Sequence, residues 1–233
     1  MSRALGGLEA RDFAAVLFDM DGTLVDSTPN VVRSWVRWAQ EEGIDPRRLA
    51  GFHGVPSRSI VEHLLPEERV EAAVTRIDEL ELADTDGITV LPGALEALKA
   101  LSALTDEPDR CAIATSCTVP LARARIGATA IPAPRVVVTA DDVARGKPHP
   151  DPYLLAAQQL GVDPRDCLVV EDAPGGLESA RAAGCATLAL TTTTAPADLF
   201  ADAVVATLAD VTFTVVGGRV RLSPAGRVPE NGV

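Results

Sequence analysis

The chain has 233 residues, of which 47% are apolar and 23% are charged, and its formal net charge is −12. This length allows one large or two small domains with a buried core, and the composition excludes collagen and intrinsic disorder. The acidic balance argues against nucleic acid or an anionic membrane as a partner, because the overall field repels their phosphates. A small anionic ligand would need local positive groups, and only two of the 21 basic residues are lysines, Lys99 and Lys147.

The cysteines and the N-terminus indicate the cellular compartment. The four cysteines lie in or beside apolar runs without the spacing of metal sites, so buried, reduced thiols are expected. The first twelve residues lack the apolar segment of a signal peptide. No apolar run reaches the roughly 18 residues of a membrane span. We therefore expect a soluble, cytoplasmic protein, either a monomer or a homodimer.

The first predicted element is a strand at residues 14–18, and a long helical stretch follows it. Helical patterns cover residues 30–42, 57–65 and 66–83, and no convincing strand occurs between residues 27 and 92. Pro92-Gly93 marks the return to another pattern. We therefore expect a discontinuous core, residues 1–26 and 93–233, with an all-helical cap domain inserted at residues 27–92.

From residue 93 onward, helices alternate with short apolar strands. Helices are predicted at residues 93–104, 119–126, 152–160 and 174–183, and strands at residues 111–114, 135–139, 167–170 and 185–190. Apolar runs without polar alternation suit strands that are buried on both faces of a parallel sheet. The alternation predicts the α/β class, with a doubly wound, Rossmann-like sheet that binds ligands at the carboxyl ends of its strands. Gly217-Gly218 between two further apolar runs predicts a hairpin.

The first strand ends in two carboxylates, Asp19 and Asp21, which Gly22 and Thr23 follow. Extended geometry places the two acids on the same side of the chain. Gly22 lets backbone N–H groups approach an anion closely. Neighbouring carboxylates repel each other, so a cation between them or a bound proton is expected. The alternative for this segment is a turn with capping aspartates.

Three later strand ends carry further polar groups. Thr115 and Ser116 can donate hydrogen bonds to an anion, or they can cap the helix that follows. Lys147 lies in a loop constrained by glycine and proline, which suits a positioned point charge. Glu171 and Asp172 form a second carboxylate pair before a glycine-containing turn. Oxygen-rich clusters without histidine or cysteine favour a hard cation such as Mg²⁺.

Four segments, DMDGTLVDS, ATS, GKPHPDPY and EDAPGG, occur in the order and at the intervals of the haloacid dehalogenase superfamily. From about residue 13 to about residue 222, the chain resembles the phosphatases of that superfamily that carry a helical cap after the first motif. The last two motifs look like those of phosphatases acting on glycerol, hexitol or deoxyhexose phosphates. The resemblance implies Mg²⁺-dependent hydrolysis of a small phosphorylated sugar or polyol through an aspartyl-phosphate.

Carried over position by position, the resemblance implies a role for each motif residue. Asp19 would be the nucleophile, and Asp21 would be the general acid and base. The groups that would hold the phosphoryl oxygens are Thr115, Ser116, Lys147 and Gly22. The Mg²⁺ ligands would be Asp19, Asp21 through its carbonyl, Asp172, and Glu171 as a ligand or an orienting group.

A loop in the helical stretch is a candidate for substrate contact. His53, Gly54 and Arg58 resemble the cap loop that faces the active site of sugar phosphatases. The alternative is an exposed turn before a helix that Ser57 caps.

Other activities of the superfamily share parts of this pattern. β-Phosphoglucomutase has the same four motifs, but a histidine and an arginine of its cap fall at Val31 and Ser57 here. Phosphoglycolate phosphatase usually reads Thr-Asn-Lys where this chain reads Thr-Ser-Cys. Metal-free dehalogenases lack the second aspartate, and phosphonatases need a cap lysine, which residues 27–92 do not contain. A phosphate-binding protein without activity is disfavoured because every matched motif residue is intact.

Overall fold

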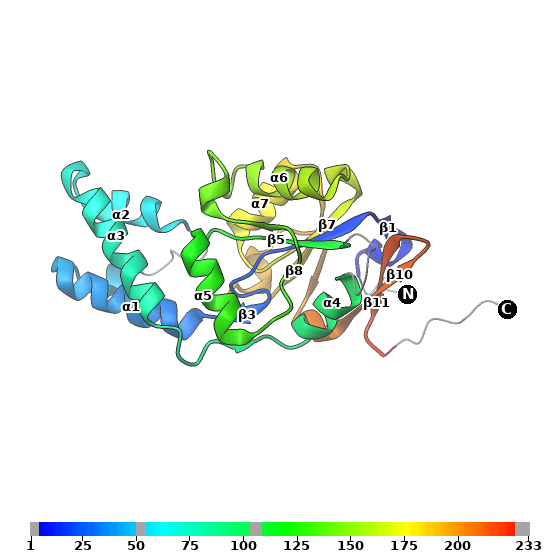
Figure 1. Ribbon diagram of the computed structural model, residues 1–233, viewed down its shortest axis with the longest axis horizontal. Helices are drawn as coiled ribbons and strands as arrows, with labels where there is room; N and C mark the ends of the chain where they lie inside the picture. Colours follow the sequence, from blue (N-terminus) through cyan, green and yellow to red (C-terminus); the bar gives the residue numbers. More distant parts are fainter. Residues whose placement is uncertain (1–4, 50–54, 103–108, 227–233) are drawn as a thin grey trace.

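The computed structural model describes residues 5–49, 55–102 and 109–226, and a six-stranded parallel sheet lies at its centre (Figure 1). The strands are β2 (Ala15–Phe18), β5 (Cys111–Ala114), β6 (Val137–Val138), β7 (Cys167–Glu171), β8 (Ala186–Leu190) and β9 (Ala203–Val205). Their order across the sheet is β6-β5-β2-β7-β8-β9. Counted along the chain this order is 3-2-1-4-5-6, which confirms the predicted doubly wound, Rossmann-like fold.

Helices cover both faces of the sheet. They are α4 (Ala94–Leu101), α5 (Val119–Thr129), α6 (Asp151–Leu160) and α7 (Pro174–Ala182). Consecutive side chains of a strand point to opposite faces. Val16 and Phe18 of β2 therefore join a cluster with α4 and α5, whereas Ala15 and Leu17 join one with α6 and α7. All four residues of β2 are buried, which explains its unbroken apolar sequence.

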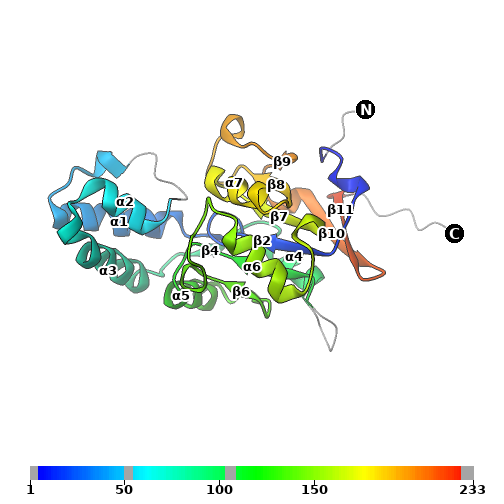
Figure 2. The ribbon, with the colours of Figure 1, turned by 90° about the horizontal axis from the view of Figure 1, so that it is seen from above.

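Three helices form a separate unit at one end of the molecule, as both views show (Figures 1 and 2). They are α1 (Thr28–Glu42), α2 (Ser57–Leu64) and α3 (Glu67–Ala83). These helices bury a hydrophobic cluster of their own, in which the rings of Trp35 and Trp38 pack edge to face, 5.2 Å apart. Trp38 also donates its indole N–H to the carbonyl of Ala73 at 2.9 Å. We retain the cap boundary, residues 27–92, as a proposal that this separate cluster supports.

Two short strands join the helical unit to the sheet. β3 (Val25–Asp26) and β4 (Thr89–Val90) pair in antiparallel register, so the chain leaves and re-enters the α/β unit side by side. The sequence predicts no strand between residues 27 and 92, and β4 shows that this prediction is wrong. A strand of two residues is too short to produce a recognisable alternation of apolar and polar side chains.

A small antiparallel sheet lies at the opposite end of the molecule (Figure 2). Its order is β1 (Asp12–Phe13), β11 (Arg219–Pro224) and β10 (Val211–Val216). Gly217 and Gly218 connect β10 to β11 with φ values of 57° and 74°, which confirms the predicted hairpin. The 3-10 helices are Leu8–Ala10, Pro46–Leu49, Ala140–Asp142, Pro164–Asp166, Pro196–Asp198 and Leu208–Asp210. In the described part of the chain, no helix combines the length and the apolar character needed to cross a membrane.

Candidate active site

Two acidic segments meet where the strand order of the sheet reverses, between β2 and β7. The connections that follow two such neighbouring strands lead to opposite sides of the sheet, and this leaves a crevice at the carboxyl ends of the strands. Asp19 follows β2, and Glu171 ends β7, with Asp172 next in the chain. Because Phe18 lies beside Val170 in the register, the three carboxylates emerge together. One oxygen of each lies within 4.8 Å of the others.

The ammonium group of Lys147 lies between two of these carboxylates. It donates to Asp19 Oδ1 at 2.6 Å and to Glu171 Oε1 at 2.7 Å, and only 5% of the residue is exposed. Burial acts to lower the pKa of Lys147, but attraction to Asp19 and Glu171 outweighs it and holds that pKa well above its ordinary value. Lys147 is therefore a fixed positive charge at the base of the site.

The acids at this position are difficult to ionise together. Burial raises the pKa of Asp19 well above its ordinary value, although Lys147 opposes the rise. Burial and the charge of Glu171 raise the pKa of Asp172 to about 7. Thr23 donates to Asp172 Oδ1 at 3.2 Å, and Thr193 donates to Oδ2. A bound cation would relieve the repulsion among these carboxylates.

The carboxylate oxygens of Asp19 and Asp172 are the ligand atoms that remain available for such a cation. Hard oxygen donors of this kind fit Mg²⁺. Glu171 differs, because its Oε1 already accepts from Lys147 and from the Tyr153 hydroxyl, the latter at 3.0 Å. Its Oε2 accepts the backbone N–H groups of Asp172 and Ala173 at 2.9 and 3.0 Å. Four donors occupy both oxygens of Glu171, which favours an orienting role over ligation.

Two glycines of the motifs leave room for the carboxylates. Gly22 has a φ of 85°, and a Cβ at that position would lie 2.2 Å from Asp172 Oδ2. A Cβ at Gly176 would lie 1.6 Å from Glu171 Oε1. Both distances are far below van der Waals contact, so a side chain at either glycine would displace a carboxylate.

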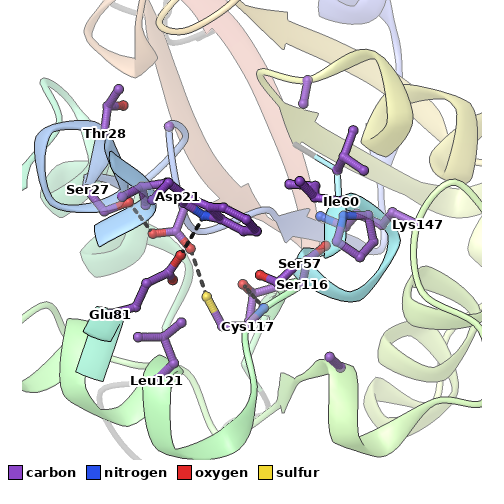
Figure 3. A pocket seen from close by; sticks show the side chains of 18 of the residues that line it. Asp21, Ser27, Thr28, Ser57, Ile60, Glu81, Ser116, Cys117, Leu121 and Lys147 are labelled. Carbon is purple, nitrogen blue, oxygen red and sulfur yellow. Dashed lines mark hydrogen bonds between the residues drawn. The ribbon is translucent and has the colours of Figure 1, made fainter. Parts of the chain in front are cut away.

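Asp21 belongs to a second cluster, away from Lys147 (Figure 3). Its Oδ1 accepts a hydrogen bond from the Ser27 hydroxyl at 2.6 Å. Its Oδ2 lies 2.7 Å from a guanidinium nitrogen of Arg125 and accepts the thiol of Cys117 at 3.0 Å. Burial and the charge of Asp21 raise the pKa of Cys117 well above its ordinary value, so the thiol keeps its proton and acts as a donor.

The guanidinium of Arg125 also reaches the helical unit. Its second terminal nitrogen lies 2.9 Å from Glu81 Oε2 on α3, and Glu81 Oε1 accepts the indole N–H of Trp35 at 3.1 Å. Neither Arg125 nor Glu81 belongs to one of the four sequence motifs, and neither was predicted as a site residue. The available signal is a charge on an otherwise apolar helix face, because Arg125 follows Leu121 by four residues and Glu81 follows Ile77 by four.

Of the other predicted site residues, Thr115 and Ser116 lie beside the carboxylates and Arg58 lies on the helical unit. Thr115 is buried directly after β5, where its hydroxyl oxygen accepts the backbone N–H of Cys117 at 3.1 Å. Ser116 is exposed at the rim of the site. Arg58 on α2 forms an ion pair with Glu71 at 2.7 Å. His53 and Gly54 lie outside the described residues.

A pocket of about 740 Å³ connects the motif residues with the helical unit. Its base holds Asp19, Asp21, Lys147 and Asp172, and Ser116 and Thr115 lie beside them. Apolar side chains of the helical unit form the opposite wall, among them Val31, Trp35, Leu49, Val55, Ile60 and Val74. A buried acid–base cluster at the base of a half-apolar pocket is typical of a site for a small, polar-headed ligand.

Comparisons with known proteins relate the chain to a family of hydrolases. A model of the haloacid dehalogenase-like hydrolases matches residues 13–184. Hexitol phosphatase A of Escherichia coli strain K12 is 47% identical over 186 residues, covering 78% of this chain and 83% of that protein. Glycerol-1-phosphate phosphohydrolase 2 of Saccharomyces cerevisiae is 33% identical over 189 residues, covering 77% of this chain and 75% of that protein.

A solved structure gives the same result for the fold. A hydrolase from Pseudomonas syringae matches with a TM-score of 0.69 and 28% identity, covering 79% of this chain and 88% of that chain. One relative is named as a phosphatase and the other as a phosphohydrolase, which confirms the predicted class of phosphoric monoester hydrolase. The chain is therefore an enzyme that belongs to the haloacid dehalogenase-like hydrolase family.

Proposed function

We propose that this enzyme hydrolyses the phosphoric monoester of a small, uncharged sugar or polyol through an aspartyl-phosphate on Asp19. The observation that carries the proposal is the buried Asp19 carboxylate at the base of the pocket, 2.6 Å from the Lys147 ammonium and beside Asp172. The names of the hexitol and glycerol-phosphate relatives support the class of substrate.

The first step transfers the phosphoryl group to the enzyme. A carboxylate oxygen of Asp19 attacks phosphorus, and the bond from phosphorus to the sugar oxygen breaks with its electron pair on that oxygen. Asp21 gives its proton to this oxygen, so that the product leaves as a neutral alcohol. Lys147 neutralises part of the charge that would otherwise repel Asp19 from a phosphate dianion.

The second step restores the enzyme. Asp21, now a carboxylate, removes a proton from a water molecule as the water oxygen attacks phosphorus. The bond between phosphorus and the Asp19 oxygen breaks, which releases inorganic phosphate and leaves Asp21 protonated. Thr115, Ser116 and the backbone at Gly22 are the proposed donors to the phosphoryl oxygens during both steps.

Asp19, Asp172 and the Asp21 carbonyl are the proposed ligands of Mg²⁺, and Glu171 orients Lys147. When bound, the cation supplies positive charge to the phosphoryl oxygens. The residues fit this role because Asp19 and Asp172 are buried acids with raised pKa values, and a cation favours their charged forms.

The charges around the pocket favour a substrate without a second anionic group. Asp78 and Asp141 line the pocket together with Glu81. The basic side chains among its described lining residues, Arg58, Arg125 and Lys147, each contact a carboxylate. A polyol hydroxyl can donate to these acids, whereas the carboxylate of phosphoglycolate would be repelled.

A phosphate-release screen tests the proposal. Hexitol, glycerol and deoxyhexose phosphates are incubated with the enzyme and Mg²⁺, beside phosphoglycolate and the Asp19→Asn variant. We expect release from a polyol or sugar phosphate and none with Asp19→Asn. Absence of release by the wild-type enzyme, or equal release by the variant, would refute the proposed function.

Val31 lies in the pocket wall and argues against the mutase alternative, because an apolar side chain there cannot help Asp21 to engage a sugar hydroxyl. The corresponding test uses β-glucose 1-phosphate with a bisphosphate activator. Accumulation of glucose 6-phosphate in place of free phosphate would favour the mutase.

A further inference from the structure

The guanidinium of Arg125 connects the proposed acid–base residue to the helical unit. One terminal nitrogen lies 2.7 Å from Asp21 Oδ2, and the other lies 2.9 Å from Glu81 Oε2. Arg125 belongs to α5 of the α/β unit, whereas Glu81 belongs to α3 of the helical unit. The ion pair of Arg125 and Glu81 therefore links the α/β unit to the helical unit, and Arg125 also contacts Asp21, the proposed proton donor.

The three side chains differ in their access to the pocket. The side chains of Arg125 and Glu81 are 5% and 7% exposed, whereas that of Asp21 is 25% exposed. All three residues line the pocket, and the Asp21 carboxylate is the one whose exposed part is open to a ligand. Ser27 holds the other oxygen at 2.6 Å, so both oxygens of Asp21 have a fixed donor.

Glu81 gives the guanidinium of Arg125 a second carboxylate contact, beside those with Asp21 and the Cys117 sulfur. A buried guanidinium that faces a single carboxylate can rotate, whereas its planar, two-sided geometry is fixed when a second carboxylate occupies the other nitrogen. Trp35 donates its indole N–H to Glu81 at 3.1 Å and so fixes the second carboxylate in turn. The chain of contacts runs from α1 through α3 and α5 to Asp21.

We propose that Arg125 is a positioning residue for Asp21 and that Glu81 anchors it, so that Asp21 is correctly placed only while α3 is seated against α5. This inference rests on the proposed function, because it concerns the proton transfers of Asp21. It extends the site to two residues outside the four sequence motifs.

The test uses the fact that leaving groups differ in their need for a proton. A sugar alkoxide is a poor leaving group and needs Asp21 in the first step, whereas p-nitrophenolate leaves without a proton. The ratio kcat/KM reports the first step alone, because release of the leaving group is irreversible under initial-rate conditions. A structural defect would lower kcat/KM for both substrates, whereas misplacement of Asp21 would lower it for the alkyl phosphate only.

For Arg125→Met with Mg²⁺, we expect kcat/KM for glucitol 6-phosphate to fall about 100-fold, which is the usual size of a general-acid contribution. We expect kcat/KM for p-nitrophenyl phosphate to fall by at most about threefold, because the proton donor is not needed. Rapid mixing should then show a burst of p-nitrophenolate followed by slow turnover, since water activation in the second step still requires Asp21.

Three further variants define the cause. Arg125→Lys keeps a charge that can contact only one carboxylate, and it should recover part of the lost kcat/KM. Glu81→Gln keeps the shape of the side chain without its charge, and it should show a smaller loss with the same substrate pattern. Arg123→Met is the matched control, because Arg123 is exposed on the same helix and outside the pocket lining, and its activity should equal that of the wild type.

An equal loss on both substrates, or no loss on either, would overturn the positioning role. If Arg125→Met does not fold, Glu81→Gln and Arg125→Lys are used to compare kcat/KM for the two substrates. A wild-type enzyme that hydrolyses neither substrate would refute the proposed function itself, whereas an active wild type with a flat response of the variants would refute the role of Arg125 alone.

Discussion

The ammonium group of Lys147 forms ion pairs with two buried carboxylates, Asp19 and Glu171, at the base of the site. Lys147→Ala would leave Asp19 and Glu171 without their cation, at a cost of about 3–5 kcal/mol in the free energy of unfolding. We also expect kcat/KM to fall by about 10²–10³-fold, because charge stabilisation of the phosphoryl group is lost. Lys99→Ala on the exposed side of α4 is the control, and urea unfolding with steady-state kinetics measures both effects. Similar stabilities and kcat/KM values for the two variants would show that the charge of Lys147 does not stabilise the site.

Gly175 and Gly176 make a matched pair in the first turn of α7. A Cβ at Gly176 would lie 1.6 Å from Glu171 Oε1, whereas a Cβ at Gly175 would meet nothing within 4 Å. We expect Gly176→Ala to cost about 1–3 kcal/mol, as overpacked sites do. Gly175→Ala should be neutral or gain up to about 1 kcal/mol from reduced backbone freedom. Thermal unfolding compares them, and equal midpoints would show that the space beside Glu171 is not restricted.

At the scale of elements, α3 contributes charge to the pocket. Asp78 and Glu81 line the same wall. Asp78→Asn should raise kcat/KM for phosphoglycolate relative to glucitol 6-phosphate by about fivefold, the effect of one nearby, partly screened charge. Glu68→Gln, an exposed change on the same helix, should leave the ratio unchanged. A ratio that does not move in Asp78→Asn would mean that this wall does not select against anions.

The sequence predicts the elements that have a long or uniform pattern and misses the short ones. The helices of the helical unit and the apolar strands β2, β5, β7 and β8 lie at or near their predicted positions. β4, with two residues, and β9, with three, are too short for periodicity and exist because a neighbouring strand pairs with them. The sequence pattern therefore predicts those helices and strands that bury many of their own apolar side chains.

In the candidate site, too, the sequence predicts residues that belong to a local motif and misses contacts between distant segments. Asp19, Lys147 and Asp172 were predictable because each lies in a recognisable motif, and Asp19 and Asp172 also follow the ends of β2 and β7 directly. The pair of Arg125 and Glu81 was not, because the two residues are separated by 44 positions and meet only when α3 packs on α5. A charge on an apolar helix face indicates a buried partner without saying which residue it is.

At the scale of the whole molecule, a net charge of −12 coexists with a site proposed to bind phosphate. Buried acids near Asp172 would repel a phosphate, and Mg²⁺ binding would reverse the sign of the local field. Protons compete with the metal for Asp172, whose pKa burial raises to about 7 in the metal-free protein. Apparent affinity for Mg²⁺ should therefore rise with pH from 5 through about 7, as Asp172 loses its proton.

Calorimetric titration of the metal-free enzyme with Mg²⁺ at several pH values checks this dependence. Asp172→Asn should bind Mg²⁺ weakly at every pH, because an amide cannot supply the charge of the carboxylate. An affinity that is independent of pH, or equal in the variant, would place the metal elsewhere.

In the proposed reaction, Asp19 carries the phosphoryl group between the two steps. Asp21→Asn should form the aspartyl-phosphate from p-nitrophenyl phosphate, because this leaving group needs no proton, and should hydrolyse it slowly, because the base is missing. Acid quenching followed by peptide mass spectrometry measures the adduct directly. We expect a phosphoryl group on Asp19 that is absent from the double variant in which Asp19 is also replaced by Asn. Turnover without any adduct, or an adduct on another residue, would contradict this role of Asp19.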